Sequence, residues 1–442
     1  MIERYLPAII LLFLFILVPA VKGAASDRAG DPGGHTDVLA CEFPNEIIPA
    51  IRKQKKPPLL ILFSADPFLQ PVPAELRLRA ADLVASGTRE DIQRFGNLDL
   101  PDPVLLPQKT VRALLENGLI QGADWILPIP IEVPFLTVDQ VRSNLERDEL
   151  ATREETGTLR QTGAGVAMTI AARPFRFNRI DRLAPPPDQS LWVHIDLSYI
   201  AALYRNEIKT PIFPLVGKMI RTLAPLRSRI KGFSVSFSTE RGDVPLTLRF
   251  VGPVLKRTFA DPTVLEKVPF QWVQVSRVFY YQEFHQIGEI DKLVNKLLQA
   301  SPDRAVNHYL KYRLETMRHD PDRALAALRE AIRLDRGYAV ELFPLADREA
   351  RNGNLAAAIP LLAEALAARH EHDVHRINLA ELNLQFRDPA KARSILEPLS
   401  KLPWSKVYHP QTPDLIKQLL KAADQTEKFN FQPPEENALP FK

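Results

Sequence analysis

The stretch PDRALAALREAIRL, residues 321–334, decides the fold of the last third of this chain. Its small and apolar residues recur in LAAAIPLLAEALAA, residues 355–368, and in PAKARSILEPL, residues 389–399. The spacing is constant, because 358 − 324 = 34 and 392 − 358 = 34. A fixed period of this length indicates stacked helical hairpins that bury their apolar faces against one another. The residues expected to pack these hairpins are Ala324, Leu328, Ala331, Ala346, Ala358, Leu362, Ala365, Ala380, Ala392 and Leu396.

Start signals place two helices in each repeat. Asp320-Pro321 and Asp388-Pro389 each offer a capping side chain followed by Pro at the first helical position, and Asn352-Gly353 supplies the turn of the middle unit. The second helix of each pair is therefore predicted at 321–334, 355–369 and 389–400, and the first at 303–317, 339–351 and 373–386. A further C-terminal helix is expected at 414–424.

This pattern resembles the tetratricopeptide repeat family over about 303–400. The resemblance rests on the repeat length, on Ala346 and Ala380 where the paired helices cross, and on Gly353 in the turn. It departs from the family where Glu349 and Asn383 replace a large aromatic residue; Arg336 and His370 replace a closing Pro. The resemblance implies an all-α repeat domain, placed at 285–425, that binds another protein or peptide. Residues 426–442 are expected to be extended or disordered.

The N-terminus reads as an export signal. Residues 1–24 contain a short polar start with Arg4, an apolar run and small residues near a cleavage point, and 25–41 reads as a flexible linker. A chain of this length with Cys41 as its one cysteine has no intramolecular disulfide, which fits a bacterial periplasm or envelope. A membrane anchor is expected if the signal stays uncleaved. The net charge of +4, with both signs interspersed, favours solvated faces over nucleic-acid binding.

Residues 42–284 alternate between apolar strand patterns and helical patterns. Strands are predicted around 59–63, 125–127, 191–195 and 233–237, with helices at 74–85, 109–117, 212–223 and 246–258. The alternation predicts an α/β layered, mostly parallel sheet. The aromatic, β-branched segment 270–284 is predicted to be an edge strand or hairpin.

Polar residues follow three of these strands, where ligands of parallel sheets bind. The segments Ser64-Ala65-Asp66, His194-Ile195-Asp196-Leu197-Ser198 and Ser238-Thr239-Glu240 resemble strand-end motifs of the arginase and deacetylase superfamily, in an uncharacterised arginase-like branch. The resemblance spans about 45–265. It implies a two-metal site, for which Asp66, Asp196 and Glu240 would be the remaining candidate ligands.

The ligand set that the resemblance implies is incomplete. The first motif lacks its histidine, the outer aspartates of the second are His194 and Ser198, and His194 is the one histidine between residues 36 and 284. A metal-activated water needs several converging carboxylates and imidazoles. We therefore expect a degenerate, arginase-like domain without catalytic residues, metal or cofactor. We also take His194 and Asp196 to point to opposite faces of their strand, so that they share no metal.

Two further segments approach the sequence motifs of functional sites. Gly232-Phe233-Ser234-Val235-Ser236 approaches a nucleophile elbow, but Ser236 occupies the second glycine position, so the elbow is rejected. His370, His372 and His375 lie between two repeats, but no nearby carboxylate set completes a site, and a solvated connector is expected.

Two functions follow. The first is an exported, non-catalytic scaffold that binds a protein through its helical repeats. The alternative is a divergent metal-dependent C–N hydrolase with the repeats as an accessory.

Overall fold

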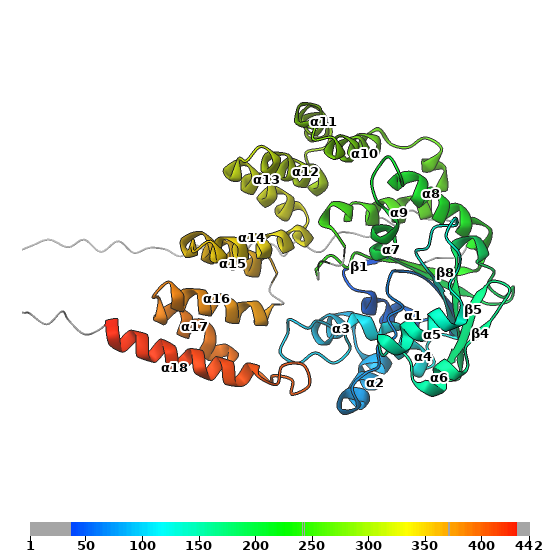
Figure 1. Ribbon diagram of the computed structural model, residues 1–442, viewed down its shortest axis with the longest axis horizontal. Coiled ribbons are helices and arrows are strands. Elements are labelled where there is room, and N and C mark those ends of the chain that lie inside the picture. The colour runs from blue at the N-terminus through cyan, green and yellow to red at the C-terminus, as the bar shows by residue number, and fades with distance from the viewer. Residues whose placement is uncertain (1–36, 241, 243, 370–371, 431–442) are drawn as a thin grey trace, which may run out of the picture. The chain divides into compact units, whose positions relative to one another are not determined.

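The computed structural model describes residues 37–240, 242, 244–369 and 372–430. The expected signal peptide and residues 431–442 of the expected tail lie outside this part of the chain. Within it, an eight-stranded sheet is followed by a region made of helices (Figure 1). The expected order, an α/β sheet region and then an all-helical region, is confirmed. The strands are β1 (Asp37–Cys41), β2 (Leu59–Phe63), β3 (Gly122–Ile126), β4 (Arg160–Gln161), β5 (Gly165–Ile170), β6 (Arg173–Asn178), β7 (Leu191–Asp196) and β8 (Ile230–Ser236).

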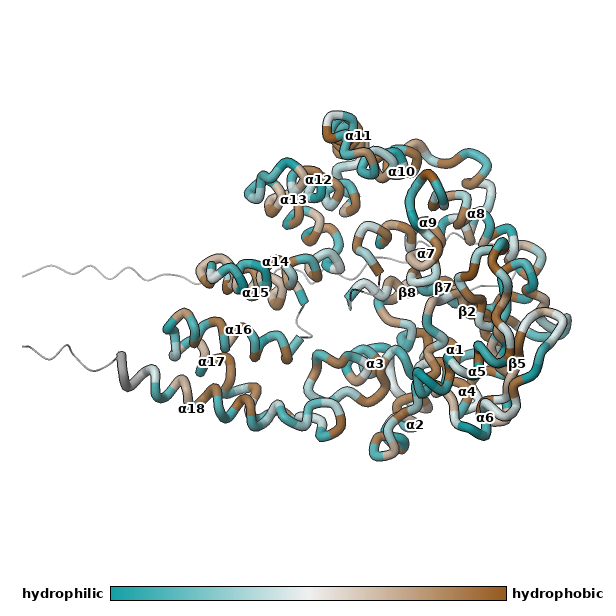
Figure 2. Tube along the Cα trace, in the orientation of Figure 1, coloured by the Kyte–Doolittle hydropathy of each residue, from teal (hydrophilic) through white to brown (hydrophobic). Residues whose placement is uncertain are grey.

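The sheet has the order β1-β8-β7-β2-β3-β6-β5-β4. The six strands from β1 to β6 in this order pair in parallel, and β5 and β4 extend the β6 edge in antiparallel orientation. The expectation of a mostly parallel sheet is therefore confirmed. In Figure 2, hydrophobic residues follow the central strands, as expected for strands that are covered on both faces.

Strand β2 shows how the two faces are filled. All five of its residues are buried, with Leu59, Ile61 and Phe63 in one hydrophobic core and Leu60 and Leu62 in another. Since successive side chains of a strand point to opposite faces, the two cores lie on opposite sides of the sheet. The helices of the sheet region are α1 (Ile48–Arg52), α2 (Arg77–Ser86), α3 (Arg89–Gly96), α4 (Thr110–Glu116), α5 (Val138–Arg147), α6 (Arg153–Gly157), α7 (Leu197–Leu203), α8 (Ile212–Leu223) and α9 (Val251–Ala260).

The helical region continues from the sheet region without a break in the core. Leu310 and Leu314 belong to the same hydrophobic cluster as Phe233 and Val193 of the sheet, so the core crosses the boundary expected at 284/285. The helices of this region are α10 (Phe270–Glu283), α11 (Ile287–Ala300), α12 (Ala305–Met317), α13 (Pro321–Leu334), α14 (Leu342–Arg351), α15 (Leu355–Ala368), α16 (Asp373–Gln385), α17 (Pro389–Leu399) and α18 (Thr412–Asn430).

Helices α12/α13, α14/α15 and α16/α17 pack as consecutive pairs (Figure 1). Asp320 and Asp388 accept hydrogen bonds from the backbone N–H groups of Arg323 and Lys391, as the expected N-caps of α13 and α17. All ten small and apolar residues expected to pack the hairpins are buried. Gly353 has φ of +77°, which explains why glycine ends α14.

Four segments differ from expectation. Residues 37–41, expected in a linker, form the edge strand β1, which pairs with β8. The segment 270–284, expected as a strand, is helix α10, because its buried residues Val275, Val278 and Phe279 follow helical spacing. Strands β5 and β6 form an unexpected hairpin. Residues 426–430, expected in an extended or disordered tail, belong to helix α18, which continues to Asn430.

Polar contacts join the helical region to the sheet region. Arg249 bonds Glu42, which follows β1, and Asp335, which follows α13. Arg369, after α15, pairs with Glu240, which follows β8. The helical region is thus anchored close to the edge at which β1 and β8 end.

Candidate functional site

A pocket of about 690 Å³ lies at the carboxyl ends of the central strands. The sheet order places β8, β7 and β2 side by side and parallel, so the segments that follow them meet at one edge. This brings together Asp66, Asp196, Ser198 and Ser238, all of which the sequence placed at strand ends. The pocket is lined by Phe43, Pro44, Ala65, Asp66, Phe68, Gln70, Pro107, Gln108, Asp196, Ser198, Ala201, Ala202, Ser238 and Pro245.

Asp196 is the most constrained polar residue of the pocket. It ends β7 and caps α7, and its side chain is buried. One carboxylate oxygen accepts a hydrogen bond from the Ser198 N–H at 2.9 Å, and the other accepts the hydroxyls of Ser236 and Ser238. Burial raises the pKa of the Asp196 carboxyl, and the three hydrogen bonds oppose that rise. Its acceptor positions are therefore largely used by the protein itself.

A buried chain of hydrogen bonds extends from Asp196 into the sheet. The Ser236 hydroxyl lies 3.0 Å from His194 Nε2, and His194 Nδ1 lies 2.9 Å from the Ser234 hydroxyl, whose oxygen accepts a hydrogen bond from Trp192 Nε1. Burial lowers the pKa of His194 to about 3, so its imidazole is neutral near pH 7. Because the Ser236 hydroxyl donates to Asp196, its oxygen accepts a hydrogen bond from His194 Nε2–H, and the unprotonated Nδ1 accepts one from the Ser234 hydroxyl.

The expectation that His194 and Asp196 face opposite sides of their strand was wrong. Residues two positions apart on a strand share a face. Both side chains accordingly reach the same Ser236 hydroxyl on β8. Ser234 and Ser236, which connect the two side chains, are also two positions apart on one strand and share a face. The alternation of side chains along a strand could have shown both relationships from the sequence.

Ser238 has an unusual backbone conformation. Its φ is +51°, in the left-handed region that few residues other than glycine adopt, and its N–H donates to the Glu42 carbonyl at 2.8 Å. The turn presents its hydroxyl to the pocket beside Asp196. Both nitrogens of His194 are taken by Ser234 and Ser236, so the imidazole does not activate Ser238 as a nucleophile. Ser234 is buried within β8, away from any turn, which agrees with rejecting an elbow there.

The loop after β2 is tied to the loop after β7. The Ala65 N–H donates to the Ser198 hydroxyl at 3.1 Å, and the Phe68 N–H donates to Asp66 Oδ1 at 2.6 Å. Asp66 lines the pocket, and the Ser64 hydroxyl binds the Asp66 carbonyl beneath it. These bonds fix the pocket wall formed by residues 64–68.

Glu240 does not join Asp66 and Asp196. Its side chain is 3% exposed and forms an ion pair with Arg369 of the helical region. A guanidinium partner neutralises the carboxylate and competes with a cation for its oxygens. Of the three residues that the arginase resemblance singled out, Asp66 and Asp196 thus line the same pocket, whereas Glu240 binds the helical region.

A different set of side chains lies close enough together that it could hold a metal ion. Asp99, His372 and His375 are the one group of at least three potential ligands found among the described residues. The two histidines were noted in the sequence without a carboxylate partner, and His370 lies outside the described residues. Asp99 comes from the sheet region, 273 residues before His372, so no local pattern could have indicated it.

No protein-family model matches this chain, and comparison with curated proteins finds no significant relative. None of the helices in the described part of the chain is long and apolar enough to cross a membrane.

Proposed function

We propose that this protein is an exported, non-catalytic scaffold that binds a partner protein through its helical region. The observation that carries the proposal is a groove of about 570 Å³ between the pairs α12/α13 and α14/α15. Stacked helical hairpins commonly use such grooves to hold extended segments of other proteins. The groove is lined by Tyr312, Thr316, His319, Asp320, Pro321, Asp322, Ala324, Leu325, Leu345, Arg348, Glu349, Asn354, Ala357 and Leu361.

The chemistry of the groove favours a basic, extended peptide. Small and apolar side chains such as Leu325, Leu345 and Ala357 leave room for a backbone and its apolar side chains. Among the lining residues, the three carboxylates of Asp320, Asp322 and Glu349 outnumber the one guanidinium. Complementary charge would steer a segment carrying Lys or Arg into this groove.

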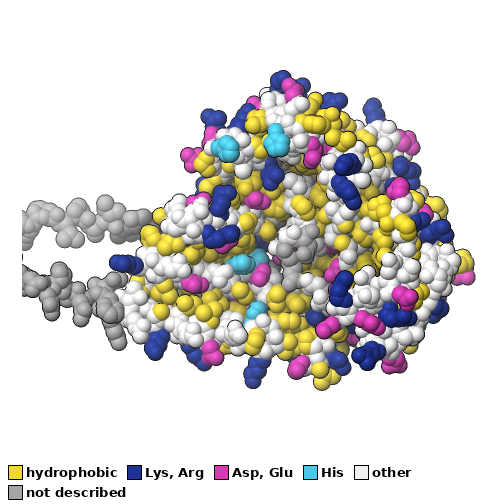
Figure 3. All heavy atoms as spheres, in the orientation of Figure 1, with side chains coloured by type: hydrophobic (Ala, Val, Ile, Leu, Met, Phe, Trp, Pro, Cys, Tyr) yellow, Lys and Arg dark blue, Asp and Glu magenta, His cyan; other side chains and the backbone are white. Residues whose placement is uncertain are grey.

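The repeat spacing and the buried small residues support a tetratricopeptide-like array as the origin of the groove. The position of Ala358, fully buried in α15, matches the close helix contacts expected of such repeats. The proposed location, the periplasm or cell envelope, rests on the composition of residues 1–24. Interspersed charges of both signs on the face drawn in Figure 3 are consistent with a protein partner rather than nucleic acid.

For the sheet region we propose a degenerate, arginase-like domain whose pocket binds a small polar ligand. Support comes from the meeting of three strand-end segments in one pocket and from the hydroxyl groups of Ser198 and Ser238 beside Asp196. A serine hydroxyl that donates within the protein keeps an oxygen that can accept, so the pocket suits a ligand with hydrogen-bond donors.

The alternative is a divergent metal-dependent C–N hydrolase, and the shared pocket position of Asp66 and Asp196 is the observation that favours it. Metal analysis of the purified protein separates the two functions. Stoichiometric manganese, zinc or iron that disappears in Asp196→Asn, while the variant keeps its melting temperature, would support the hydrolase. A metal content that is unchanged by this substitution would contradict the hydrolase, and the scaffold function would remain.

The scaffold is tested with immobilised extended peptides of basic, acidic and neutral composition, using the full chain as the probe. We expect basic peptides with interspersed apolar residues to bind best and binding to weaken with salt. Asp322→Lys should reduce binding at least tenfold, because it reverses charge at the groove. The matched control is Asp303→Lys, an exposed residue of the same region outside the groove. Equal binding of all peptide classes, or equal loss in both variants, would contradict the proposal.

A further inference from the structure

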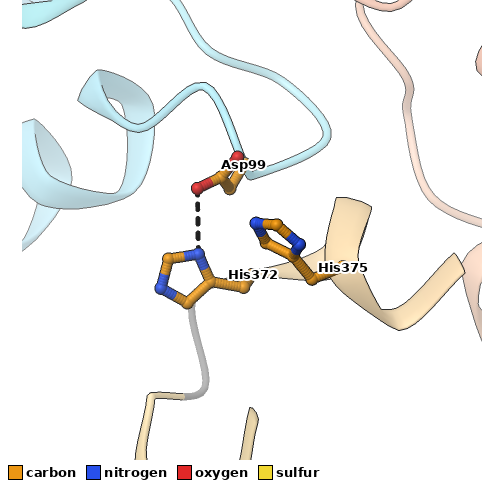
Figure 4. A group of neighbouring side chains, drawn as sticks. All are labelled: Asp99, His372 and His375. Carbon is orange, nitrogen blue, oxygen red and sulfur yellow. Dashed lines mark hydrogen bonds and ion pairs between the residues drawn. The ribbon is translucent and has the colours of Figure 1, made fainter. Parts of the chain in front are cut away.

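Three side chains from two distant segments converge at the junction between the sheet region and the helical region. Asp99 lies in the loop between α3 and the short 3-10 helix Pro107–Lys109, and His372 and His375 lie at the start of α16. One ligand atom from each lies within 4.8 Å of the other two. Figure 4 shows Asp99 above His372 and a ring nitrogen of His375 turned toward them. The distance from His372 Nδ1 to Asp99 Oδ2 is 2.9 Å.

We propose that Asp99, His372 and His375 bind a divalent transition-metal cation of the zinc class. Two imidazole nitrogens and one carboxylate oxygen are a ligand set that Zn²⁺ accepts, with a water molecule completing a tetrahedron. Mg²⁺ and Ca²⁺ prefer sites made of oxygen atoms, so the two histidines select against them. His372 Nδ1 and Asp99 Oδ2 are hydrogen-bonded to each other, and a bound cation would replace that hydrogen bond.

The imidazoles are prepared for such a role. His372 is 2% exposed, and the ring atom that faces the cluster is Nδ1, which is bonded to Asp99 Oδ2. Its Nε2 is buried without a hydrogen-bond partner among the described residues and points away from Asp99 and His375 (Figure 4), so that an ordered water could accept its N–H while Nδ1 binds the ion.

Packing fixes the orientation of both rings. The Phe343 ring lies with its centroid 5.2 Å from that of His372 and 4.4 Å from that of His375. A rigid apolar wall beside two ligands reduces the ordering that metal binding requires. The backbone carbonyl of Asp99 also accepts the N–H of Val374 at 3.1 Å, which holds the loop against the helix.

One electrostatic effect opposes a cation. The site lies at the N-terminus of α16, where the helix dipole is positive. The negative charges of Asp99 and Asp373 offset the positive end of the dipole. The Asp373 carboxylate also forms an ion pair with Arg376, with 3.2 Å between Oδ1 and Nη1. We therefore expect weaker Zn²⁺ binding than at a site with several thiolates.

A metal ion bound by Asp99, His372 and His375 would link the sheet region to the helical region, and we call this link the metal clasp. The same loop accepts hydrogen bonds from the helical region at Pro101, from the Ser405 N–H at 2.8 Å, and at Leu100, from His409 Nε2 at 2.9 Å. Since the ligands come from both sides, the full site exists only when α16 is docked on this loop. Metal binding would therefore stabilise the docked arrangement, by a free energy that increases with the logarithm of the free metal concentration above Kd.

The test uses the full chain without an affinity tag, freed of metal with a chelator. Zn²⁺ is titrated by calorimetry, and Co²⁺ is titrated by absorption spectroscopy, which distinguishes tetrahedral from octahedral sites. We expect one Zn²⁺ per chain, a tetrahedral Co²⁺ spectrum displaced by Zn²⁺, and a melting temperature that rises with Zn²⁺ and not with Mg²⁺.

The variants Asp99→Asn and His375→Ala should each weaken Zn²⁺ binding at least tenfold and remove the Co²⁺ spectrum. His308→Ala, a histidine of the same helical region outside the cluster, should bind as the unchanged protein does. Circular dichroism shows whether each variant is folded, and Asp99→Asn keeps the backbone contacts of the loop.

Absence of stoichiometric Zn²⁺ binding, or full binding in both folded ligand variants, would overturn the clasp. Loss of metal in Asp196→Asn alone would place it in the strand-end pocket and also overturn the clasp. The peptide experiments on the groove are independent of each of these results.

Discussion

Arg249 Nε lies 2.8 Å from Asp335 Oδ2, joining two residues 86 positions apart across the junction of the sheet and helical regions. The same guanidinium bonds Glu42 at 2.8 Å and lies over the Phe237 ring, 4.3 Å from its centroid. Because Arg249 is 8% exposed, these contacts are shielded from water. One side chain thus holds the end of β1 and the segment after α13 together.

Replacing Arg249 with Met should destabilise the protein by about 2–3 kcal/mol. The Met side chain retains the apolar stem but leaves Glu42 and Asp335 without their cation, and the partial exposure of Asp335 keeps the loss below that of a fully buried pair. Urea unfolding followed by circular dichroism measures the change. Arg329→Met is the matched control, since Arg329 pairs with Glu364 at the surface and should change stability by less than about 1 kcal/mol. Equal losses in the two variants would refute the special role of Arg249.

The buried His194 should make stability depend on pH. Burial lowers its pKa to about 3 from 6.5, so the unfolded chain binds the proton more readily than the native protein does. The resulting stabilisation is fully present above pH 6.5 and is lost as the pH falls toward 3, with a limit of about 4–5 kcal/mol. The raised pKa of Asp196 acts in the opposite direction, because its protonation favours the native state.

His194→Gln should therefore flatten the loss of stability between pH 6.5 and the acid limit of folding. Denaturant unfolding at a series of pH values measures the slope in both proteins, and the contribution of Asp196 is common to them. His308→Gln serves as a control for an imidazole that lies outside the sheet. A slope unchanged by His194→Gln would show that His194 is not a neutral buried group.

Ala358→Glu should disrupt the helical region while the far core of the sheet stays folded. Ala358 is fully buried in α15, so a glutamate there would bury an unpaired charge at about 3–5 kcal/mol. Hydrogen exchange should show lost protection in α14 and α15 and retained protection in β2. Ala356→Glu, an exposed position of the same helix, should leave exchange unchanged. Protection of α15 in the Ala358 variant would contradict its placement at the helix contact.

Two glycines should respond oppositely to alanine. Gly353 has φ of +77°, so Gly353→Ala should cost about 1 kcal/mol although no described atom lies within 4 Å of the new Cβ. Gly288 has the same open space but lies near the start of α11 without a positive φ, and Gly288→Ala should stabilise by about 0.4–1 kcal/mol. Thermal melting of the two variants measures both changes, and the same sign for both would refute the backbone argument.

The parts of the fold that could be predicted are those with local signals. Helix α13 begins at Pro321 and ends at Leu334 as expected, because an Asp cap, Pro at the first position and regular apolar spacing all agree. Strand β2 was equally clear, since five consecutive apolar residues are bounded by prolines and polar residues. These segments depend little on distant parts of the chain.

The misread elements lacked such signals or carried misleading ones. The β5–β6 hairpin turns through Ala171 and Ala172, with φ of +47° and +61°, where turn rules anticipate Gly or Asn. Helix α10 is rich in aromatic and β-branched residues, a composition that suggests a strand, and tertiary packing overrides it. Strand β1 is short and lies at an edge, so its partner β8 defines it more than its own residues do.

The candidate sites divide in the same way. The strand-end pocket could be anticipated, since Asp66, Asp196 and Ser238 each follow a recognisable strand. The partners that determine their chemistry could not, because the pairing of Glu240 with Arg369 and of Asp99 with His372 depends on how the helical region folds back onto the sheet region.

The position of β1 also has a kinetic consequence. Among the described strands β1 pairs with β8 alone, and Cys41 lies opposite Ser236, almost at the other end of the sheet region in sequence. The first strand must therefore wait for the last one to be synthesised and folded, and contacts this distant slow the search for the native topology. Until then β1 and the edge of β8 with which it pairs have unsatisfied backbone hydrogen-bonding groups. Newly made chains would therefore associate incorrectly through these two strands, and a chaperone would be needed most while they are exposed.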